Sequence, residues 1–208
     1  MIVAVKNFLA VDTSGGYLSV VARKGETVFS SLTEDCAMKH SVLLMEKIDE
    51  AFNALSLTPA ECDFFGAVVG AGSFTGIRIG ISAIKGFCLA ENKPALPVTS
   101  FDLMAYTRVD TDKILCLIDA LHGFYYASGY ENGEVVYPPN YISEEEVFRL
   151  KKEGYRLFST EKLPFATTVV DPKKGLENAV CALEKKGAFG ELTALYIRKS
   201  SAEINAGR

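Results

Sequence analysis

The sequence predicts an α/β protein built from two similar lobes, and two observations carry that prediction. A short apolar strand ends at Asp12, with Gly16 following in the next turn, and the same pair recurs after a second apolar strand as Asp119 and Gly123. The order of the predicted elements also agrees, because in each half a run of strands joined by turns is followed by a helix and a further strand. We therefore expect a duplicated α/β unit with its boundary near Ser100.

The first lobe is assigned to residues 1–100 and is expected to begin with a three-stranded meander. An amphipathic helix, a buried strand, an apolar helix and an edge strand follow, as marked by alternating or helically spaced apolar residues. Thr58 and Glu61 frame a short capping box in front of the buried strand. The elements are placed, in order, at residues 8–12, 17–23, 27–33, 40–55, 64–69, 77–89 and 94–98.

The second, smaller lobe is assigned to residues 101–208 and is expected to repeat the strands and the helix before a last helix. Ser143 and Asp171 stand where helix N-caps are expected, and Pro172 suits the first position of a helix. The elements are placed, in order, at residues 114–119, 124–130, 134–136, 144–152, 155–159, 167–170 and 172–186.

The composition is that of an ordinary folded protein. Of the 208 residues, 49% are hydrophobic and 23% are charged, and the formal net charge is −4. Because nucleic-acid binding depends on clustered Lys and Arg, this balance argues against a protein that grips nucleic acid alone. The basic pairs at residues 151–152, 173–174 and 185–186 are interpreted as solvated helix ends.

The cysteines indicate a reducing compartment. The five lie far apart in apolar surroundings and form no C-x-x-C pair, which is typical of reduced thiols. No signal-peptide pattern opens the chain, and no apolar run is long enough to span a bilayer. We therefore expect a cytoplasmic protein without membrane contact.

A glycine-rich turn with the sequence GAGSFTGIRIG, at residues 70–80, joins the buried strand to the apolar helix. Such a turn presents N–H groups at the positive end of a helix, which suits an anion, so Gly72 and Ser73 are candidate cofactor-binding residues. The spacing matches neither the dinucleotide fingerprint nor the P-loop. The alternative is a tight turn with a purely structural use.

Asp12 is the third candidate cofactor-binding residue. It ends the first strand and faces a glycine turn, where a carboxylate would suit a phosphate-bound metal ion. The alternative is that its side chain caps its own turn. A nucleotide site would also need matched glycine loops from both lobes.

The sequence offers no catalytic or metal-binding set. The two histidines, His40 and His122, cannot form an H-x-x-x-H or H-E-x-x-H pair, so no metal site is expected. Ser73 lacks a G-x-S-x-G context and an evident histidine partner, so no nucleophile is expected.

The helix at 77–89 is apolar on almost every side and must therefore be covered on both sides. One interpretation is that a partner protein covers one side; the alternative is burial between the chain's own sheet and the helix at 40–55. On the first interpretation, the partner interface comprises Leu44, Ile48, Phe52, Ile77, Ile81, Ile84 and Phe87.

The glycine-rich motif closely resembles the signature of the bacterial TsaB (YeaZ) family, with Ala71 where that family usually carries Pro. The resemblance covers most of the chain, although Leu121 replaces the basic residue that is usual after Asp-Ala. Further similar motifs are residues 9–14, His40-Ser41, Asp119-Ala120 and residues 195–203.

The resemblance implies a two-lobed, duplicated RNase H-like fold of the actin, Hsp70 and sugar-kinase superfamily. It implies a scaffold without catalysis of its own, which pairs with the catalytic subunit TsaD through first-lobe helices and recruits the ATPase TsaE. The assembly would transfer a threonylcarbamoyl group to adenosine 37 of transfer RNAs that read codons beginning with A. The resemblance implies no cofactor of the chain's own, leaves room for ATP or ADP at the partner interface, and implies a homodimer when TsaD is missing.

Three alternatives from other classes remain open. A stand-alone ATP-dependent small-molecule kinase would use Asp12 and the loop at 70–76, and would turn over ATP alone. A metallopeptidase would show zinc-dependent proteolysis, and the missing histidine pair argues against it. A dimeric α/β domain with an unknown ligand would fail to bind any TsaD.

Overall fold

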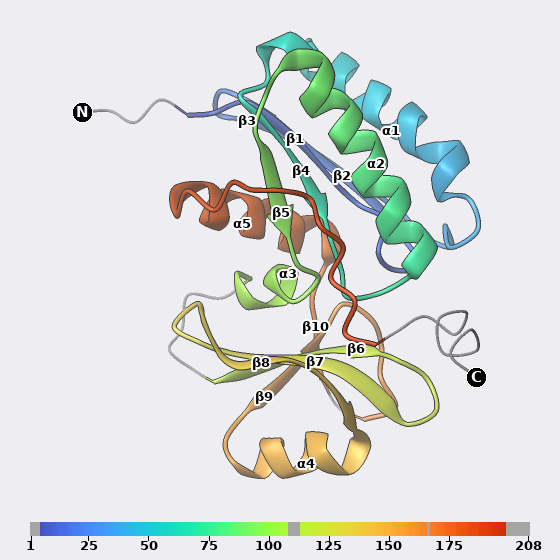
Figure 1. The fold of residues 1–208 in the computed structure, drawn as a ribbon, viewed down its shortest axis with the longest axis vertical. Helices are drawn as coiled ribbons and strands as arrows, with labels where there is room; N and C mark the ends of the chain where they lie inside the picture. The colour runs from blue at the N-terminus through green and yellow to red at the C-terminus, as the bar shows by residue number, and fades with distance from the viewer. Residues whose placement is uncertain (1–4, 108–112, 166, 199–208) are drawn as a thin grey trace.

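Two five-stranded sheets form the frame of the molecule (Figure 1). The computed structural model describes residues 5–107, 113–165 and 167–198, so the end of the motif at 195–203 lies outside the described residues. None of the helices in the described ranges is long and apolar enough to cross a membrane.

The first sheet has the strand order β3-β2-β1-β4-β5. β1 pairs antiparallel with β2 and parallel with β4, and β5 lies at the edge beside β4. The predicted meander and edge strand are therefore confirmed. The strands are β1 (Phe8–Asp12), β2 (Leu18–Lys24), β3 (Thr27–Thr33), β4 (Phe64–Val68) and β5 (Ala95–Val98).

The second sheet repeats the first, with the order β8-β7-β6-β9-β10. Its first three strands pair antiparallel, and β6 pairs parallel with β9, as β1 does with β4. Matching order and direction confirm the predicted duplication and give the α/β, RNase H-like arrangement. The strands are β6 (Ile114–Asp119), β7 (Phe124–Glu131), β8 (Glu134–Ser143), β9 (Arg156–Ser159) and β10 (Thr168–Val169).

Three of the helices in the described ranges begin at a side chain that caps them. Ser73, Ser143 and Asp171 each accept a hydrogen bond from a backbone N–H of the first turn of the helix that follows. Thr58 and Glu61 form the predicted capping box. The helices are α1 (His40–Leu55), the 3₁₀ turn η1 (Pro59–Glu61), α2 (Phe74–Glu91), α3 (Asp102–Ala105), α4 (Glu144–Lys152) and α5 (Pro172–Lys185).

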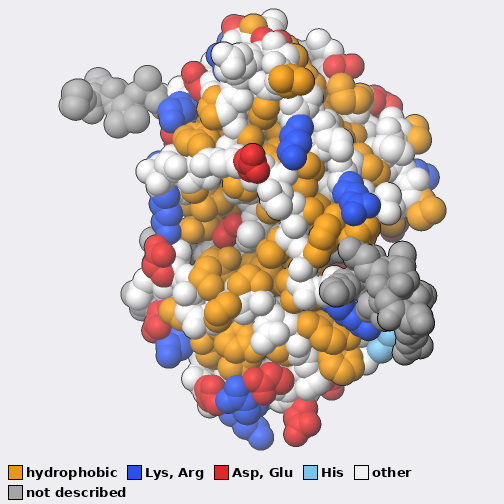
Figure 2. Space-filling model, in the orientation of Figure 1, with side chains coloured by type: hydrophobic (Ala, Val, Ile, Leu, Met, Phe, Trp, Pro, Cys, Tyr) orange, Lys and Arg blue, Asp and Glu red, His pale blue; other side chains and the backbone are white. Residues whose placement is uncertain are grey.

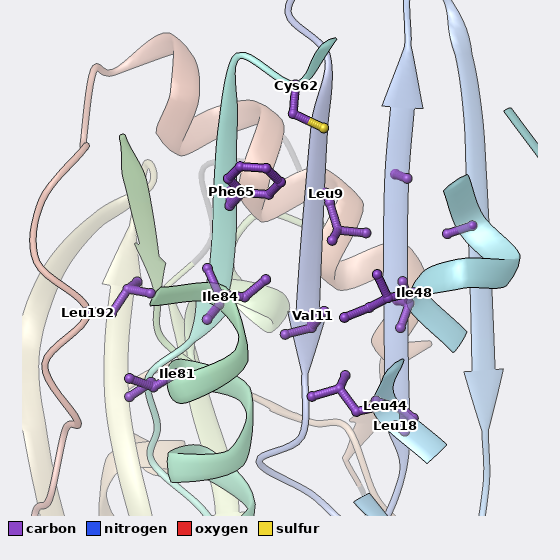
Figure 3. Close-up of a cluster of buried hydrophobic side chains, with 14 of the residues drawn as sticks. Leu9, Val11, Leu18, Leu44, Ile48, Cys62, Phe65, Ile81, Ile84 and Leu192 are labelled. Atoms are coloured by element: carbon purple, nitrogen blue, oxygen red, sulfur yellow. The ribbon is translucent and has the colours of Figure 1, made fainter. Parts of the chain in front are cut away.

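The first sheet is covered on both faces, which explains its fully buried central strands β1 and β4. Alternate residues of β1 point to opposite sides, so Leu9 and Val11 face α1 and α2, where they join Ile48 and Ile84 in one core (Figure 3). Phe8 and its alternates face the other way, against α5.

The structure corrects one part of the predicted division into residues 1–100 and 101–208. Helix α5 belongs to the second half of the chain, yet Leu176 and Val180 pack with Phe8 on the first sheet. After α5 the chain continues along the first lobe, and Leu192 joins the core of α1 and α2. The amphipathic pattern of α5 predicts a buried face but does not say which sheet it covers.

Two further elements differ from the prediction. The short helix α3 is new; its buried Leu103 packs with α5 and its Met104 with the second sheet. Strand β8 runs on to Ser143, well past Val136, through Pro138 and Pro139. It is an edge strand, where the N–H groups that proline lacks are not required for pairing.

Candidate functional site

The glycine-rich turn is shaped by close contact with the turn after β1. A Cβ on Gly72 would lie 2.4 Å from the carbonyl oxygen of Ser14, and Gly72 has a φ of +146°. Ser73 donates its N–H to the same carbonyl oxygen at 2.7 Å. A Cβ on Gly76 would lie 2.0 Å from the carbonyl oxygen of Thr13. Two of the glycines therefore let the start of α2 lie directly against residues 13–14.

Asp12 is sealed inside this contact, with no exposed surface. One carboxylate oxygen accepts hydrogen bonds from the N–H and the hydroxyl of Ser14, at 2.8 and 2.7 Å. The other accepts the hydroxyl of Tyr17 at 2.9 Å. In this geometry Asp12 caps its own turn and presents no free oxygen to a ligand.

Burial raises the pKa values of both Asp12 and Tyr17. Desolvation raises the pKa of Asp12, against hydrogen bonds from Ser14 and Tyr17 that favour the carboxylate. Burial, together with the nearby Asp12 carboxylate, raises the pKa of Tyr17 well above its usual range. His40 begins α1 in the same region, and its Nε2 lies 2.8 Å from the carbonyl oxygen of Tyr17.

A chain of hydrogen bonds links Asp12 to the start of the second half. The hydroxyl of Ser14 lies 3.1 Å from the hydroxyl of Ser100, which donates to the carbonyl oxygen of Ala71 at 2.6 Å. The N–H of Ser100 also donates to the carbonyl oxygen of Gly70 at 2.6 Å. These contacts fix the glycine-rich turn from both sides.

A cleft of about 490 Å³ lies where the two lobes meet. Gly72 lines it, whereas Asp12 and Ser73 do not, so the structure does not bring the three candidate residues to one cavity. His122 and Arg198 add basic side chains to its lining. The full lining is Ala71, Gly72, Phe74, Ala120, Leu121, His122, Tyr126, Leu195, Tyr196, Ile197 and Arg198.

The counterpart of Asp12 in the second lobe is exposed. One carboxylate oxygen of Asp119 accepts the N–H of Leu121 at 2.8 Å, and its own N–H donates to Glu161 at 3.1 Å. Asp119 thus caps its turn as Asp12 does. Among the described residues, no group of three or more His, Cys, Asp or Glu side chains is placed to hold a metal ion.

Arg78 holds the C-terminal segment against α2, a role that the sequence pattern does not reveal. The rings of Phe74 and Tyr196 stack with their centroids 4.4 Å apart. The guanidinium carbon of Arg78 lies 3.9 Å from the centroid of Phe74, and Nε donates to the Tyr196 hydroxyl at 2.9 Å. The segment after α5 is therefore tied to the helix that follows the glycine-rich turn.

The predicted partner interface is wrong for six of its seven residues. Leu44, Ile48, Phe52, Ile77, Ile81 and Ile84 are buried within the chain's own core. The seventh, Phe87, is partly buried and packs against Phe52 and Phe65. The alternative interpretation holds, because these side chains attach α1 and α2 to the first sheet.

The exposed apolar residues of this region lie on the other side of α1. Val42 and Met45 lie on α1 at helical spacing and are 74% and 49% exposed, and Met38, in the turn just before the helix, is 93% exposed. On α2, Leu89 is 86% exposed. The i, i+4, i+7 spacing of the first three is visible in the sequence, but they stand out only once Leu44 and Ile48 are known to face the core. We call Met38, Val42 and Met45 the α1 stripe.

Comparison with known proteins identifies relatives over most of the chain. A family model described as "TsaD: tRNA N6-adenosine threonylcarbamoyltransferase" matches residues 31–203. The tRNA threonylcarbamoyladenosine biosynthesis protein TsaB of Bacillus subtilis (strain 168) is 27% identical over 205 residues, which cover 95% of this chain and 90% of that protein. The TsaB protein of Escherichia coli (strain K12) is 30% identical over 131 residues, covering 61% of this chain and 55% of that protein.

Solved structures agree on the fold. A crystal structure of an uncharacterized Pseudomonas aeruginosa protein with similarity to peptidase YEAZ superposes with a TM-score of 0.78 at 20% identity, covering 93% of this chain and 100% of that one. YeaZ from Pseudomonas aeruginosa gives a TM-score of 0.74 at 19% identity, covering 92% and 100%. At this level of identity, the two structures show that the fold is shared.

Proposed function

The chain belongs to the TsaD-type family and, within it, to the TsaB (YeaZ) group, and on this premise we propose that it acts in tRNA threonylcarbamoyladenosine biosynthesis as a subunit without a catalytic centre of its own. The reaction is threonylcarbamoyl transfer to adenosine 37 of tRNAs that read codons beginning with A. The sealed Asp12 supports the proposal, since a carboxylate without exposed surface cannot touch a substrate or a phosphate-bound metal.

The α1 stripe is the single observation that carries the scaffold role. A helix whose opposite face is fixed in the core is a rigid platform. Two exposed apolar side chains on it, Val42 and Met45, together with Met38 in the turn before it, favour protein contact over solvation. We assign the pairing surface for the catalytic TsaD-like subunit to this stripe and the adjoining exposed side of α2.

The other parts of the proposed assembly are inferred from the family relationship. The TsaE-like ATPase joins the pair once it has formed, and any ATP or ADP binds between chains. In the absence of the TsaD-like subunit the α1 stripe closes a homodimer, because the same patch on two copies can pair about a two-fold axis. tRNA binds to the complex.

Co-purification with the TsaD-like protein of the same organism, followed by a transfer assay on tRNA, tests the proposal. Product that requires both chains, and that neither makes alone, is the expected result. A chain that forms no complex and on which transfer does not depend would overturn it. ATP turnover by the isolated chain would instead favour a stand-alone small-molecule kinase.

A further inference from the structure

A second groove, of about 650 Å³, lies at the end of α5, away from the α1 stripe. It forms where the chain entering β1, the strand β2 and the segment after α5 come together. Its positive and apolar lining is Val5, Lys6, Arg23, Lys185, Lys186 and Phe189, which we call the α5 groove. Figure 2 shows Lys and Arg side chains gathered along the left edge of the upper lobe, where Figure 1 draws the end of α5 below the N-terminal segment.

The groove has a net positive lining in a chain whose formal net charge is −4. Four of its lining residues carry a positive charge, and Glu184 is its one carboxylate among the described residues. Glu184 pairs with Lys6 at 3.1 Å, and Lys186 pairs with Glu134 at 2.7 Å. Two of the four positive charges are therefore paired, which leaves Arg23 and Lys185. Concentrated like charge is unfavourable unless an anion is nearby, so the groove is suited to a negatively charged occupant.

Arg23 is oriented by neutral groups. Its Nε donates to the carbonyl oxygen of Lys6 at 2.9 Å, and its Nη1 lies 3.4 Å from the Cys181 sulfur. Its guanidinium carbon lies 4.8 Å from the centroid of the Phe8 ring. Within the described ranges no carboxylate pairs with Arg23 or with Lys185. The guanidinium is therefore fixed in place while its charge stays available, as phosphate recognition requires.

The groove also carries an apolar surface beside the charges. Phe189 packs edge-on against Phe64 with ring centroids 5.3 Å apart, and the ammonium of Lys6 lies 5.0 Å from the Phe189 centroid. Cations that follow a groove beside an aromatic ring match a nucleic-acid strand, whose phosphates alternate with flat bases and sugars.

We propose that the α5 groove binds the phosphate backbone of the tRNA on which the complex acts. The inference rests on the proposed function, and it means that this chain itself contacts the tRNA. It also changes the interpretation of the basic pair Lys185-Lys186, which the sequence alone assigns to a solvated helix end. The pair at 151–152, at the end of α4, lines no part of this groove and keeps that interpretation.

The test uses the full chain in complex with its TsaD-like partner and measures the affinity for a tRNA transcript at several salt concentrations. Lys185→Glu reverses an exposed charge at the last residue of α5, and Lys152→Glu makes the same change at the last residue of α4. We expect Lys185→Glu to weaken binding and to lower the slope of log affinity against log salt by about 1. Lys152→Glu should leave both unchanged.

A double variant tests the contribution of the Arg23 guanidinium. Arg23→Gln with Lys185→Gln should lower the salt slope by about 2, with the circular dichroism spectrum unchanged. Suppose that wild type, Lys185→Glu and Lys152→Glu bind tRNA equally, in a complex that still transfers the threonylcarbamoyl group. That result would overturn this inference but leave the proposed function standing. Loss of the complex itself on Lys185→Glu would make the groove a protein-docking site and also overturn it. A wild-type complex that neither binds nor modifies tRNA would overturn the proposed function as well.

Discussion

Thr13 and Gly76 are in direct contact where the turn after β1 meets the start of α2. The Thr13 hydroxyl donates to the carbonyl oxygen of Gly76 at 2.7 Å, and a Cβ on Gly76 would lie 2.0 Å from the carbonyl oxygen of Thr13. Since neither backbone can give way easily, Gly76→Ala should lower the free energy of unfolding by about 2–3 kcal/mol, measured by urea denaturation.

Gly86 provides the matched control on the same helix. Nothing lies within 4 Å of a Cβ built there, and the residue is exposed. Gly86→Ala should therefore raise the free energy of unfolding by about 0.5–1 kcal/mol, through helix propensity alone. Equal effects at the two glycines would show that the contact with Thr13 does not constrain the turn.

The buried Asp12 predicts a pH dependence of stability. Burial raises its pKa, so the folded chain holds this proton at pH values where the unfolded chain has lost it. The free energy of unfolding should therefore fall as pH rises from about 3.8 through the raised pKa, relative to an Asp12→Asn variant that cannot titrate. Urea unfolding of both proteins across this range measures the difference.

The comparison isolates Asp12 from other groups. Asp102 is also buried with a raised pKa, but it titrates in both proteins and cancels. The amide side chain of the Asp12→Asn variant keeps an oxygen that can accept from Ser14, so the turn is retained. Parallel curves for the two proteins would mean that Asp12 has the same pKa in the folded and unfolded chains.

The α1 stripe predicts which substitutions separate pairing from folding. Val42→Asp places a charge on an exposed apolar side chain and should abolish co-purification with the TsaD-like subunit while the chain stays folded. Ala54→Asp, at an exposed position near the other end of α1, should leave pairing intact. Circular dichroism confirms folding in each case.

A variant at a buried residue of α2 serves as the comparison for the exposed position Val42. Ile84→Asp should unfold the first lobe, because Ile84 has no exposed surface and a charge there would be unpaired. Retained pairing by a folded Val42→Asp variant would place the partner surface elsewhere on the molecule.

The C-terminal segment should be needed for the stability of the first lobe. Leu192 is buried in the core that α1 and α2 share, so Leu192→Ala should cost about 2–4 kcal/mol in thermal or urea unfolding. Leu89→Ala, at a side chain that is 86% exposed, should change little. A small effect at Leu192 would mean that the segment adds nothing to the first lobe.

Much of the fold follows from local sequence patterns. A continuous apolar run predicted β1, helical spacing of apolar residues predicted α1, and a capping box predicted the start of α4, because buried faces and helix ends leave local patterns in the sequence. The duplication could be predicted because Asp12 and Asp119 each end the first strand of a unit. Contacts between residues far apart in the sequence produce no local pattern, so the packing of α5 on the first sheet could not be predicted.

Local sequence patterns also predicted only part of the candidate site. The spacing around Gly72 predicted a tight turn, but not that Asp12 would be closed off by Ser14 and Tyr17. An apolar helix also does not say which of its neighbours covers it. Burial of Ile84 by the chain's own sheet, and exposure of Met38 just before α1, required the assembled core.

The return of α5 bears on the order in which the protein can fold during synthesis. The face of the first sheet that carries Phe8 and Phe64 is covered by Leu176 and Val180, which the ribosome adds late. While the second lobe is being translated, the nascent chain therefore holds an uncovered apolar sheet that is open to chaperones and to misassembly. Release of α5 from the exit tunnel is the step that lets this face of the first sheet be covered.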